Sequence, residues 1–221
     1  MRFLFHPEAG LATLTLAGDA LTHLKALRLR EGETLFLRTL QDDLLHEYRL
    51  ESFGRRDAVL TRLESRLEAV LPPKNTHLAW CAVDPKTVEK ALPFLNELGL
   101  GRLTLLWCEK SQRSFRFDFD RMARILAASC EQCGRSRPLA IEMAECGDFL
   151  AANPHAALLD FGGEPLSGAL DEKTVLIIGP EGGFGPADYA RFKELPRYGV
   201  ASNLVLRSET ALVLAAGAFL L

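Results

Sequence analysis

In the first third of the chain, hydrophobic and polar residues alternate over short runs that are separated by turn residues. This period of two predicts β-strands with one buried face and one solvent-exposed face. One short helix is also expected at residues 19–27, with Asp19 as its N-cap. Residues 1–70 therefore predict a small antiparallel β-barrel, with strands at residues 2–5, 11–16, 33–38, 44–53 and 58–63.

A proline pair then interrupts any regular element. Pro72 and Pro73 lack backbone N–H donors, so residues 71–74 form a natural linker. Beyond the linker, apolar runs alternate with segments of helical period, which is typical of an α/β domain with a parallel sheet. We therefore expect two domains, residues 1–70 and residues 74–221. In the second domain the strands are expected at residues 77–83, 102–107, 156–161, 174–178 and 203–206, and the helices at residues 85–98, 120–133, 186–195 and 208–220.

Length and composition are those of a folded protein. The 221 residues are 48% hydrophobic, which is enough to fill real cores. The longest apolar runs, such as residues 211–221, contain glycine and fall short of the roughly 20 residues that a membrane span needs. The N-terminus lacks the basic, apolar and small-residue succession of a signal peptide. We expect a cytoplasmic protein without a membrane segment.

The chain has five cysteines, and this odd number, without a signal peptide, favours reduced thiols over a disulfide framework. Cys130 and Cys133 form a C-x-x-C pair, which occurs in redox proteins and in zinc sites. The pair falls at the end of an expected helix and has no second pair beside it, so we interpret both cysteines as ordinary helix residues. No metal site is expected, and the histidines form no catalytic triad pattern.

The net charge of −3 does not by itself favour a nucleic-acid partner, because phosphate binding is largely electrostatic. Cationic residues are nevertheless grouped locally, and the local arrangement matters more than the total. These groups fit either an RNA-binding surface or scattered solubilising charge, and the sequence leaves both interpretations open. The groups are Lys25, Arg28 and Arg30; Arg55 and Arg56; Lys110, Arg113 and Arg116; and Arg135 and Arg137.

The strongest chemical signal is a loop near the C-terminus that follows an expected strand. Its residues 178–184 read Ile-Gly-Pro-Glu-Gly-Gly-Phe, and Gly185 and Pro186 follow. Glycine permits close backbone approach, and proline fixes the entry and exit angles of the chain. The loop has neither Gly-Lys-Ser/Thr nor G-x-G-x-x-G, so nucleotide hydrolysis and dinucleotide binding lack their usual contacts. A phosphate site remains an alternative.

A second segment, residues 205–211, passes from apolar residues through Arg-Ser-Glu-Thr into a long apolar helix. Hydroxyl and carboxylate groups suit the start of a helix, where they satisfy exposed N–H groups and interact favourably with the helix dipole. Two such loops beside one sheet can enclose a small cofactor with their backbone groups.

Together these two segments resemble the SPOUT superfamily of knotted RNA methyltransferases, and most closely the family of ribosomal RNA small subunit methyltransferase E. Three further stretches agree with that family, so the likeness runs the length of the chain. They are Arg2-Phe3 with residues 23–28, the Glu-Leu-Gly of residues 97–99, and the Glu-Gln-Cys-Gly-Arg of residues 131–135. The resemblance implies a trefoil knot in the C-terminal domain, a PUA-like N-terminal barrel and a homodimer, in which the apolar C-terminal helix is a candidate interface element.

The resemblance further implies methylation of N3 of a uridine in 16S ribosomal RNA, with S-adenosylmethionine as the cofactor. Methyl transfer from a sulfonium needs little acid–base machinery, because the leaving group is already activated and positioning supplies much of the rate. The residues implied to bind the cofactor are Leu159; Ile178, Gly179, Pro180, Glu181, Gly182 and Gly183; and Leu206, Ser208, Glu209 and Thr210.

Uridine N3 carries a proton at neutral pH, so the site must favour the anion, for example through a guanidinium group. Arg207, Arg135 and Arg113 are the candidates for this catalytic role. N3 cannot be reached in a paired base, so the target must be unpaired or flipped out. The residues expected to hold the ribosomal RNA are Lys25, Arg28, Arg30 and Gln132.

The sequence departs from the family at Ser202, Asn203 and Leu204, where a glycine followed by a basic residue is usual. Either Ser202 adopts the backbone geometry of that glycine, or the loop is reshaped. Three other functions remain open. They are methylation of a ribose 2′-OH or of tRNA by the same fold, RNA binding without catalysis, and redox chemistry at the C-x-x-C pair.

Overall fold

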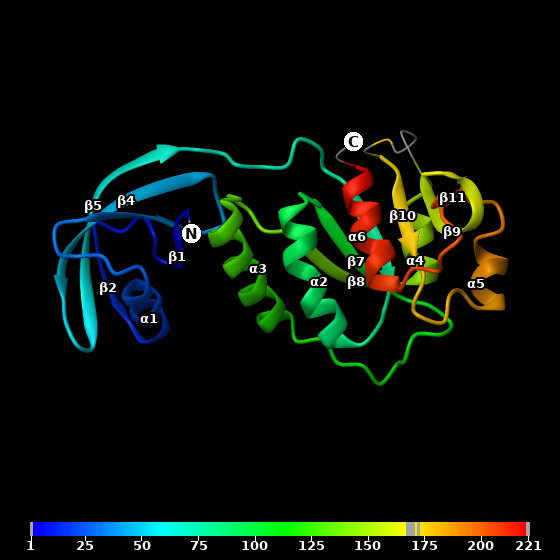
Figure 1. Cartoon of the computed structure of the whole chain (residues 1–221), viewed down its shortest axis with the longest axis horizontal. Helices are drawn as coiled ribbons and strands as arrows, with labels where there is room; N and C mark the ends of the chain where they lie inside the picture. The colour runs from blue at the N-terminus through cyan, green and yellow to red at the C-terminus, as the bar shows by residue number, and fades with distance from the viewer. Residues whose placement is uncertain (1, 167–170, 172, 220–221) are drawn as a thin grey trace. The chain divides into compact units, whose positions relative to one another are not determined.

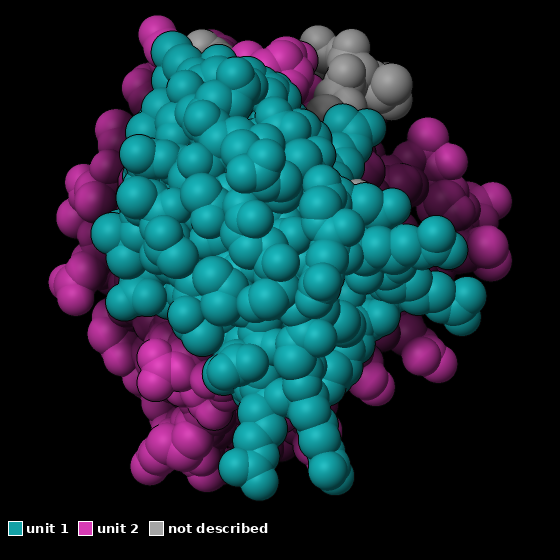
Figure 2. Space-filling view, turned by 90° about the vertical axis from the view of Figure 1, so that its left-hand side faces the viewer, with its two compact units in different colours: residues 1–71, 127–138 teal, residues 72–126, 139–221 magenta. Residues whose placement is uncertain are grey.

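The computed structural model describes residues 2–166, 171 and 173–219 (Figure 1). The chain divides into two compact units, which have different colours in Figure 2. Each unit contains its own β-sheet and its own hydrophobic core. Unit 1 comprises residues 1–71 and 127–138, and unit 2 comprises residues 72–126 and 139–221. The linker expected at residues 71–74 falls where unit 1 first passes into unit 2.

Unit 1 contains β1 (Leu4–Phe5), β2 (Thr13–Ala17), α1 (Gly18–Ala26), β3 (Thr34–Arg38), β4 (Leu44–Phe53) and β5 (Asp57–Leu67). Its curled half-barrel sheet has the order β1-β3-β4-β5-β2, and every pair is antiparallel except β1 with β3. The prediction of Asp19 as an N-cap is wrong, because α1 begins at Gly18 after Ala17. Asp19 lies in the first turn instead, where its charge favours the helix dipole.

The last turns of α3 (Phe119–Cys133) belong to unit 1, whereas residues 127–138 are expected from the sequence in the second domain. The buried Glu131 carboxylate accepts the backbone N–H of Phe5 at 2.7 Å, and burial raises the pKa of this carboxyl group. The backbone carbonyl of Glu131 accepts the N–H of Arg2 at 2.8 Å. The N-terminal stretch that contains Arg2 and the stretch of residues 131–135 are therefore in contact within unit 1.

Unit 2 contains β6 (His77–Cys81), α2 (Pro85–Glu97), β7 (Arg102–Trp107), the first turns of α3, β8 (Ala140–Glu145), α4 (Cys146–Ala152), β9 (Ala156–Pro165), β10 (Val175–Ile178), α5 (Pro186–Arg191), β11 (Arg197–Gly199) and α6 (Ser208–Ala218). All strand pairs are parallel in the order β11-β9-β10-β6-β7-β8, which confirms the predicted parallel sheet. Successive residues of β6 and β10 are buried in clusters on opposite faces, which explains their uninterrupted apolar sequence.

Residues 203–206 do not form the predicted strand. The strand that pairs with the edge of the sheet is β11, earlier in the chain. Leu204 and Val205 are apolar but 75% and 79% exposed, so their hydrophobicity reflects a surface loop and not a buried strand. β8 and α4 were not predicted from the sequence. β8 is an edge strand that contains Glu142 and Glu145, and it lacks the continuous apolar run of the inner strands.

Cys81 and Cys108 are joined by a disulfide, with a Cα–Cα distance of 5.6 Å. The expectation of five reduced thiols is therefore wrong for this pair. Cys81 ends β6 and Cys108 follows the last residue of β7, and these two strands are neighbours in the sheet. The two cysteines are close because their strands are adjacent in the sheet. The number of cysteines in a sequence does not show which strands are adjacent.

Candidate functional site

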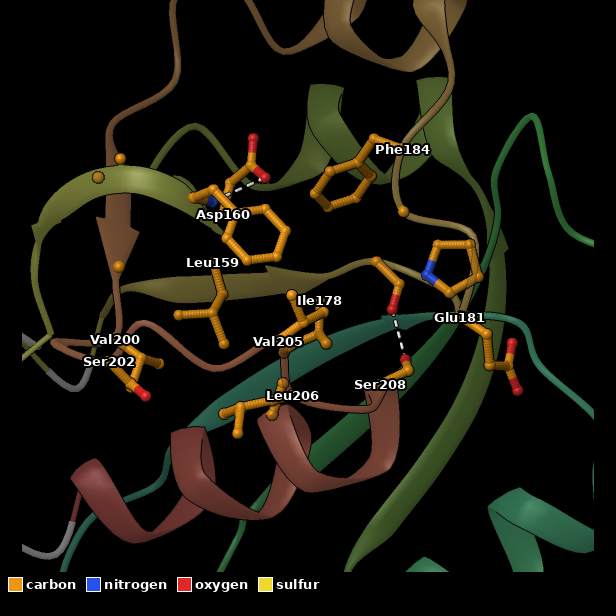
Figure 3. A pocket seen from close by; sticks show the side chains of 18 of the residues that line it. Leu159, Asp160, Ile178, Glu181, Phe184, Val200, Ser202, Val205, Leu206 and Ser208 are labelled. Atoms are coloured by element: carbon orange, nitrogen blue, oxygen red, sulfur yellow. Dashed lines mark hydrogen bonds between the residues drawn. The ribbon is translucent and has the colours of Figure 1, made fainter.

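A cavity of about 290 Å³ opens at the carboxyl ends of β9 and β10 in unit 2 (Figure 3). Ligands of open α/β sheets bind at this edge, and the volume is near the lower limit for small-molecule sites. Three segments form its walls: the end of β9, the loop after β10, and the stretch between β11 and α6. The lining residues are Leu159, Asp160, Phe161, Gly162 and Gly163; Ile178, Gly179, Pro180, Glu181, Gly183 and Phe184; and Gly199, Val200, Ser202, Leu204, Val205, Leu206, Ser208 and Ala211.

The loop after β10 is a tight turn anchored by an aromatic residue. The N–H of Gly183 donates to the carbonyl of Pro180 at 2.9 Å, and Gly183 has a φ of 65°, which favours glycine. Phe184 is buried against the rings of Tyr189 and Phe192, at centroid distances of 5.8 and 5.3 Å. Burial of Phe184 therefore holds the end of the turn against α5.

The turn after β7 braces the same loop from the side. The buried carboxylate of Asp188 accepts the backbone N–H groups of Glu109 and Gly185 at 3.1 Å. The Glu109 carboxylate in return accepts the N–H of Ala187 at 2.7 Å. Lys110 donates from Nζ to the carbonyl of Gly182, also at 2.7 Å. These hydrogen bonds restrict the conformation of the glycine loop by holding it against the turn that follows β7.

Ser208 joins the second motif segment to the first. Its hydroxyl donates to the carbonyl of Gly179 at 2.5 Å, which Figure 3 shows as a dashed line. The same oxygen accepts the indole N–H of the buried Trp80 at 2.6 Å. The start of α6, the end of β10 and the middle of β6 are thereby connected through one hydroxyl group.

In the segment that departs from the family, a turn is held by the side chain of Ser202. The N–H of Leu204 donates to the Ser202 hydroxyl at 3.1 Å, and the N–H of Ser202 donates to the carbonyl of Val200 at 2.7 Å. Ser202 does not have a positive φ. The serine side chain therefore caps this turn without the backbone freedom of glycine, as serine does in other tight turns.

The wall formed by β9 was not predicted from the sequence, apart from Leu159. The register between β9 and β11 jumps from Leu158 to Glu164, so residues 159–163 bulge out of the ladder. A Cβ atom on Gly163 would lie 2.5 Å from the backbone carbonyl carbon of Tyr198, so only glycine fits there. The Phe-Gly-Gly of this bulge follows an apolar strand, as the glycines of the first motif do, and that signal was available in the sequence.

Most of the predicted cofactor residues line the cavity. Gly182 does not line it, and its carbonyl is bonded to Lys110. Glu209 and Thr210 also do not line it, because they lie in the first turn of α6 beyond Ser208. In Figure 3 the side chain of Glu181 lies at the opposite end of the site from Val200 and Ser202.

Arg207 is the predicted catalytic residue that borders the cavity. It is the exposed N-cap residue of α6 and stands between two lining residues, Leu206 and Ser208. Within the part of the chain that the structure describes, its guanidinium group forms no ion pair. Its charge is therefore available to a bound molecule.

The other two candidate arginines lie elsewhere. Arg113 lines a second hollow of about 220 Å³ and donates to both carboxylate oxygens of Glu145, at 2.5 and 2.9 Å. This pairing lowers the pKa of the Glu145 carboxyl group, and the Arg113 guanidinium also stacks 5.1 Å from the ring of Trp107. Arg135 belongs to unit 1, is 7% exposed and donates from Nε to the carbonyl of Arg137. Burial lowers the pKa of Arg135.

The predicted RNA-binding residues all lie in unit 1. Lys25, at the end of α1, donates from Nζ to the carbonyl of Arg55 at 3.2 Å. This bond places the turn between β4 and β5, with Arg55 and Arg56, beside Lys25 and the loop that follows α1. Two basic groups that are separate in the sequence thus form one exposed patch, which consists of Lys25, Arg28, Arg30, Arg55 and Arg56. Gln132 is exposed on α3.

No three His, Cys, Asp or Glu side chains among the described residues are grouped closely enough to hold a metal ion. Within the same residues, no helix combines the length and the apolar character required to cross a bilayer.

Comparison with known proteins places the chain among RNA methyltransferases. The model of the RNA methyltransferase domain family matches residues 71–220. A ribosomal RNA small subunit methyltransferase E from Helicobacter pylori is 39% identical over 221 residues, which cover 98% of each chain. A second such enzyme, from another strain of that species, is 38% identical over the same length.

Solved structures share the fold. A ribosomal RNA small subunit methyltransferase E from Neisseria gonorrhoeae, bound to S-adenosyl methionine, superposes with a TM-score of 0.81 at 22% identity, covering 99% of this chain and 96% of that one. A methyltransferase described as putative from Legionella pneumophila, in complex with the same cofactor, has a TM-score of 0.77 at 23% identity, covering 97% of this chain and 95% of that one.

Proposed function

The chain belongs to the family of ribosomal RNA small subunit methyltransferase E, and we propose that it methylates N3 of a uridine in 16S ribosomal RNA with S-adenosylmethionine as the cofactor. The proposal rests on one observation. The two C-terminal segments through which the chain resembles this family, residues 178–184 and 205–211, meet as walls of a single cavity. A protein that only bound RNA through unit 1 would not need that arrangement.

The residues of the cavity fit the cofactor by their chemistry. S-adenosylmethionine supplies a methyl group on a sulfonium sulfur, which is already a good leaving group. Leu159, Ile178 and Leu206 provide apolar surface for the flat adenine ring, and the glycines of the β9 bulge and the β10 loop expose backbone N–H and C=O groups. Backbone groups held by a rigid scaffold orient a ligand without losing side-chain freedom.

Arg207 is proposed to act on the uracil. Removal of the N3 proton leaves negative charge that is shared with O2 and O4, and a nearby guanidinium stabilises that anion. Arg207 borders the cavity and has no ion pair within the described residues, whereas Arg113 is already paired with Glu145. Arg135 stays a candidate from unit 1.

The basic patch of unit 1 is proposed to hold the ribosomal RNA. Its five cations lie on exposed side chains, and none forms an ion pair within the described residues. Phosphate contacts of this kind position an RNA without reading its sequence. Because N3 lies on the Watson–Crick edge, the target uridine must be unpaired or flipped out of its stack.

The remaining expectations from the family belong to the same proposal. We infer that unit 1 acts as a PUA-like RNA-binding domain and that unit 2 contains a trefoil knot. The meeting of residues 178–184 with the stretch before α6 supports the knot. We also infer that the protein is a cytoplasmic homodimer.

The experiment that tests the proposal is transfer of labelled methyl from S-adenosylmethionine to small ribosomal subunits that lack base methylation. Digestion to nucleosides should place the label in 3-methyluridine. Label in a ribose-methylated nucleoside, or in tRNA only, would support another methylation by the same fold. Absence of both label and cofactor binding would support RNA binding without catalysis.

A further inference from the structure

A buried hydrogen-bond chain runs from the core of unit 2 to the wall of the cavity. Trp80 is fully buried in β6 and lies in register with Ile178, the last residue of β10. Its indole N–H donates to the hydroxyl of Ser208 at 2.6 Å, and that hydroxyl donates to the carbonyl of Gly179 at 2.5 Å. Trp80 itself does not line the cavity.

The chemistry of the three groups fixes the direction of this chain. An indole N–H can only donate, and a backbone carbonyl can only accept. Ser208 has one hydroxyl hydrogen, and the carbonyl of Gly179 receives it. The hydroxyl is therefore not available to donate to a ligand, although Ser208 lines the cavity. Consecutive bonds with one direction also polarise and strengthen each other.

The peptide group between Gly179 and Pro180 depends on this bond for its orientation. Gly179 has no Cβ to restrict its backbone angles, and Pro180 has no N–H that could form a second bond. The carbonyl of Gly179 is thus the polar group through which this peptide plane is held, and it lies at the entry of the glycine turn. If the bond were lost, the turn from Pro180 to Gly183 would start at a variable angle.

An indole in the interior of an apolar strand also requires an explanation. A phenylalanine or leucine would fill the space without a polar atom, whereas a buried N–H without an acceptor costs free energy. The partner of this N–H is Ser208, the first residue of α6. Trp80 and Ser208 thereby couple three elements at the site: β6, the end of β10 and α6.

We propose that Trp80 is a positioning residue for the cofactor site, acting through Ser208 on the carbonyl of Gly179. This inference rests on the proposed function, because it assumes that the cavity binds S-adenosylmethionine. Ser208 then contributes to affinity by orienting the first loop, and its hydroxyl is not a direct donor to the cofactor.

The test uses the full chain with Trp80→Phe, Ser208→Ala and the double variant. Tyr48→Phe is the matched control, because Tyr48 is also fully buried and its hydroxyl donates to the carbonyl of Leu11 at 2.6 Å, but it lies in unit 1. Calorimetry should show that the Kd for S-adenosylmethionine rises about tenfold in each single variant and no further in the double variant, since coupled residues are not additive. Tyr48→Phe should lose thermal stability with an unchanged Kd.

Steady-state kinetics provide a second measurement, because a purely structural role would not change the KM for the cofactor selectively. In Trp80→Phe the KM for the cofactor should rise, while kcat at saturating cofactor and the KM for RNA stay within about twofold of wild type. Ser208→Thr keeps the hydroxyl and should retain wild-type affinity. Wild-type affinity in Trp80→Phe, or additive losses in the double variant, would overturn this inference alone. Absence of cofactor binding by the wild-type protein would overturn the proposed function, and this inference with it.

Discussion

The buried carboxylate of Asp188 accepts the backbone N–H of Glu109 at 3.1 Å, so the start of α5 is bonded to the turn that follows β7. The same carboxylate accepts the N–H of Gly185, at the end of the glycine loop. A single side chain thus satisfies two backbone donors from segments that are far apart in the sequence. The structure of the cavity wall depends on this contact although Asp188 does not line the cavity.

Replacement of Asp188 by alanine should destabilise the protein and weaken the cofactor site. Two backbone N–H groups lose their acceptor, and at about 1–3 kcal/mol for each, a loss of about 2–6 kcal/mol is expected in urea unfolding. Glu194→Ala is the control, because Glu194 is 84% exposed and its one ion pair among the described residues is with Lys193 at 3.6 Å. An Asp188→Ala protein as stable as this control would contradict the bracing role.

Gly163→Ala should affect the β9 wall by steric conflict. The added Cβ would lie 2.5 Å from the carbonyl carbon of Tyr198 and 2.7 Å from that of Arg197, and backbone atoms cannot rotate out of the way. We expect a loss of about 1–3 kcal/mol and a weaker Kd for S-adenosylmethionine. Gly217→Ala, in α6 with nothing within 4 Å, should keep or slightly raise stability. Equal stability of the two variants would show that β11 can move away from the bulge.

Acid should destabilise unit 2 through His77. Burial lowers the pKa of His77 to about 4, and its Nε2 is 2.8 Å from the hydroxyl of Thr104, which donates to Glu142. The unfolded chain takes up the proton near pH 6.5, whereas the folded state does so only near pH 4. Stability is therefore complete above about pH 6.5 and falls towards pH 4, by roughly 3 kcal/mol from this group.

His77→Gln removes this titration and isolates the effect from that of other groups. Arg102, Glu142 and the edge-on ring of Phe149 face the imidazole and are unchanged in the variant. Urea unfolding at intervals between pH 4 and 7 should show a smaller loss in the variant than in the wild type. Parallel pH profiles would mean that His77 is protonated equally in both states.

The basic patch should bind RNA through phosphate contacts. Arg30→Gln and Arg55→Gln should each weaken RNA affinity at low salt and reduce the slope of log K against log salt by about one, while Kd for the cofactor is unchanged. Lys193→Gln in unit 2 is the matched control for loss of one exposed cation. An unchanged salt slope in both patch variants would mean that these residues only solubilise the protein.

Much of the fold was predictable because the inner strands of unit 2 are buried on both faces. β7 has the predicted bounds, and β10 differs by one residue. The stretch around Val205 was predicted as a strand because its residues are apolar. These side chains line the rim of a cavity, where apolar residues do not follow the two-residue period of a strand. An exposed apolar loop and a short buried strand have the same local sequence pattern.

The candidate site was predictable only where glycines or family motifs marked it. Trp80 carried no signal, because a tryptophan in an apolar strand resembles any other core residue until its N–H partner is known. The disulfide partner of Cys81 depended on which strand lies next to β6. Such relations arise from tertiary neighbours, and the local pattern does not contain them.

The most direct test of the central claim is nucleoside analysis of small ribosomal subunits after incubation with this protein and labelled S-adenosylmethionine. We predict label in 3-methyluridine for the wild-type protein, and a strong reduction for Gly163→Ala at limiting cofactor. Cofactor binding to the wild type with label only in another nucleoside would keep the cavity assignment but contradict the uridine-N3 assignment. Full activity of Gly163→Ala, with unchanged cofactor affinity, would contradict the assignment of this cavity as the cofactor site.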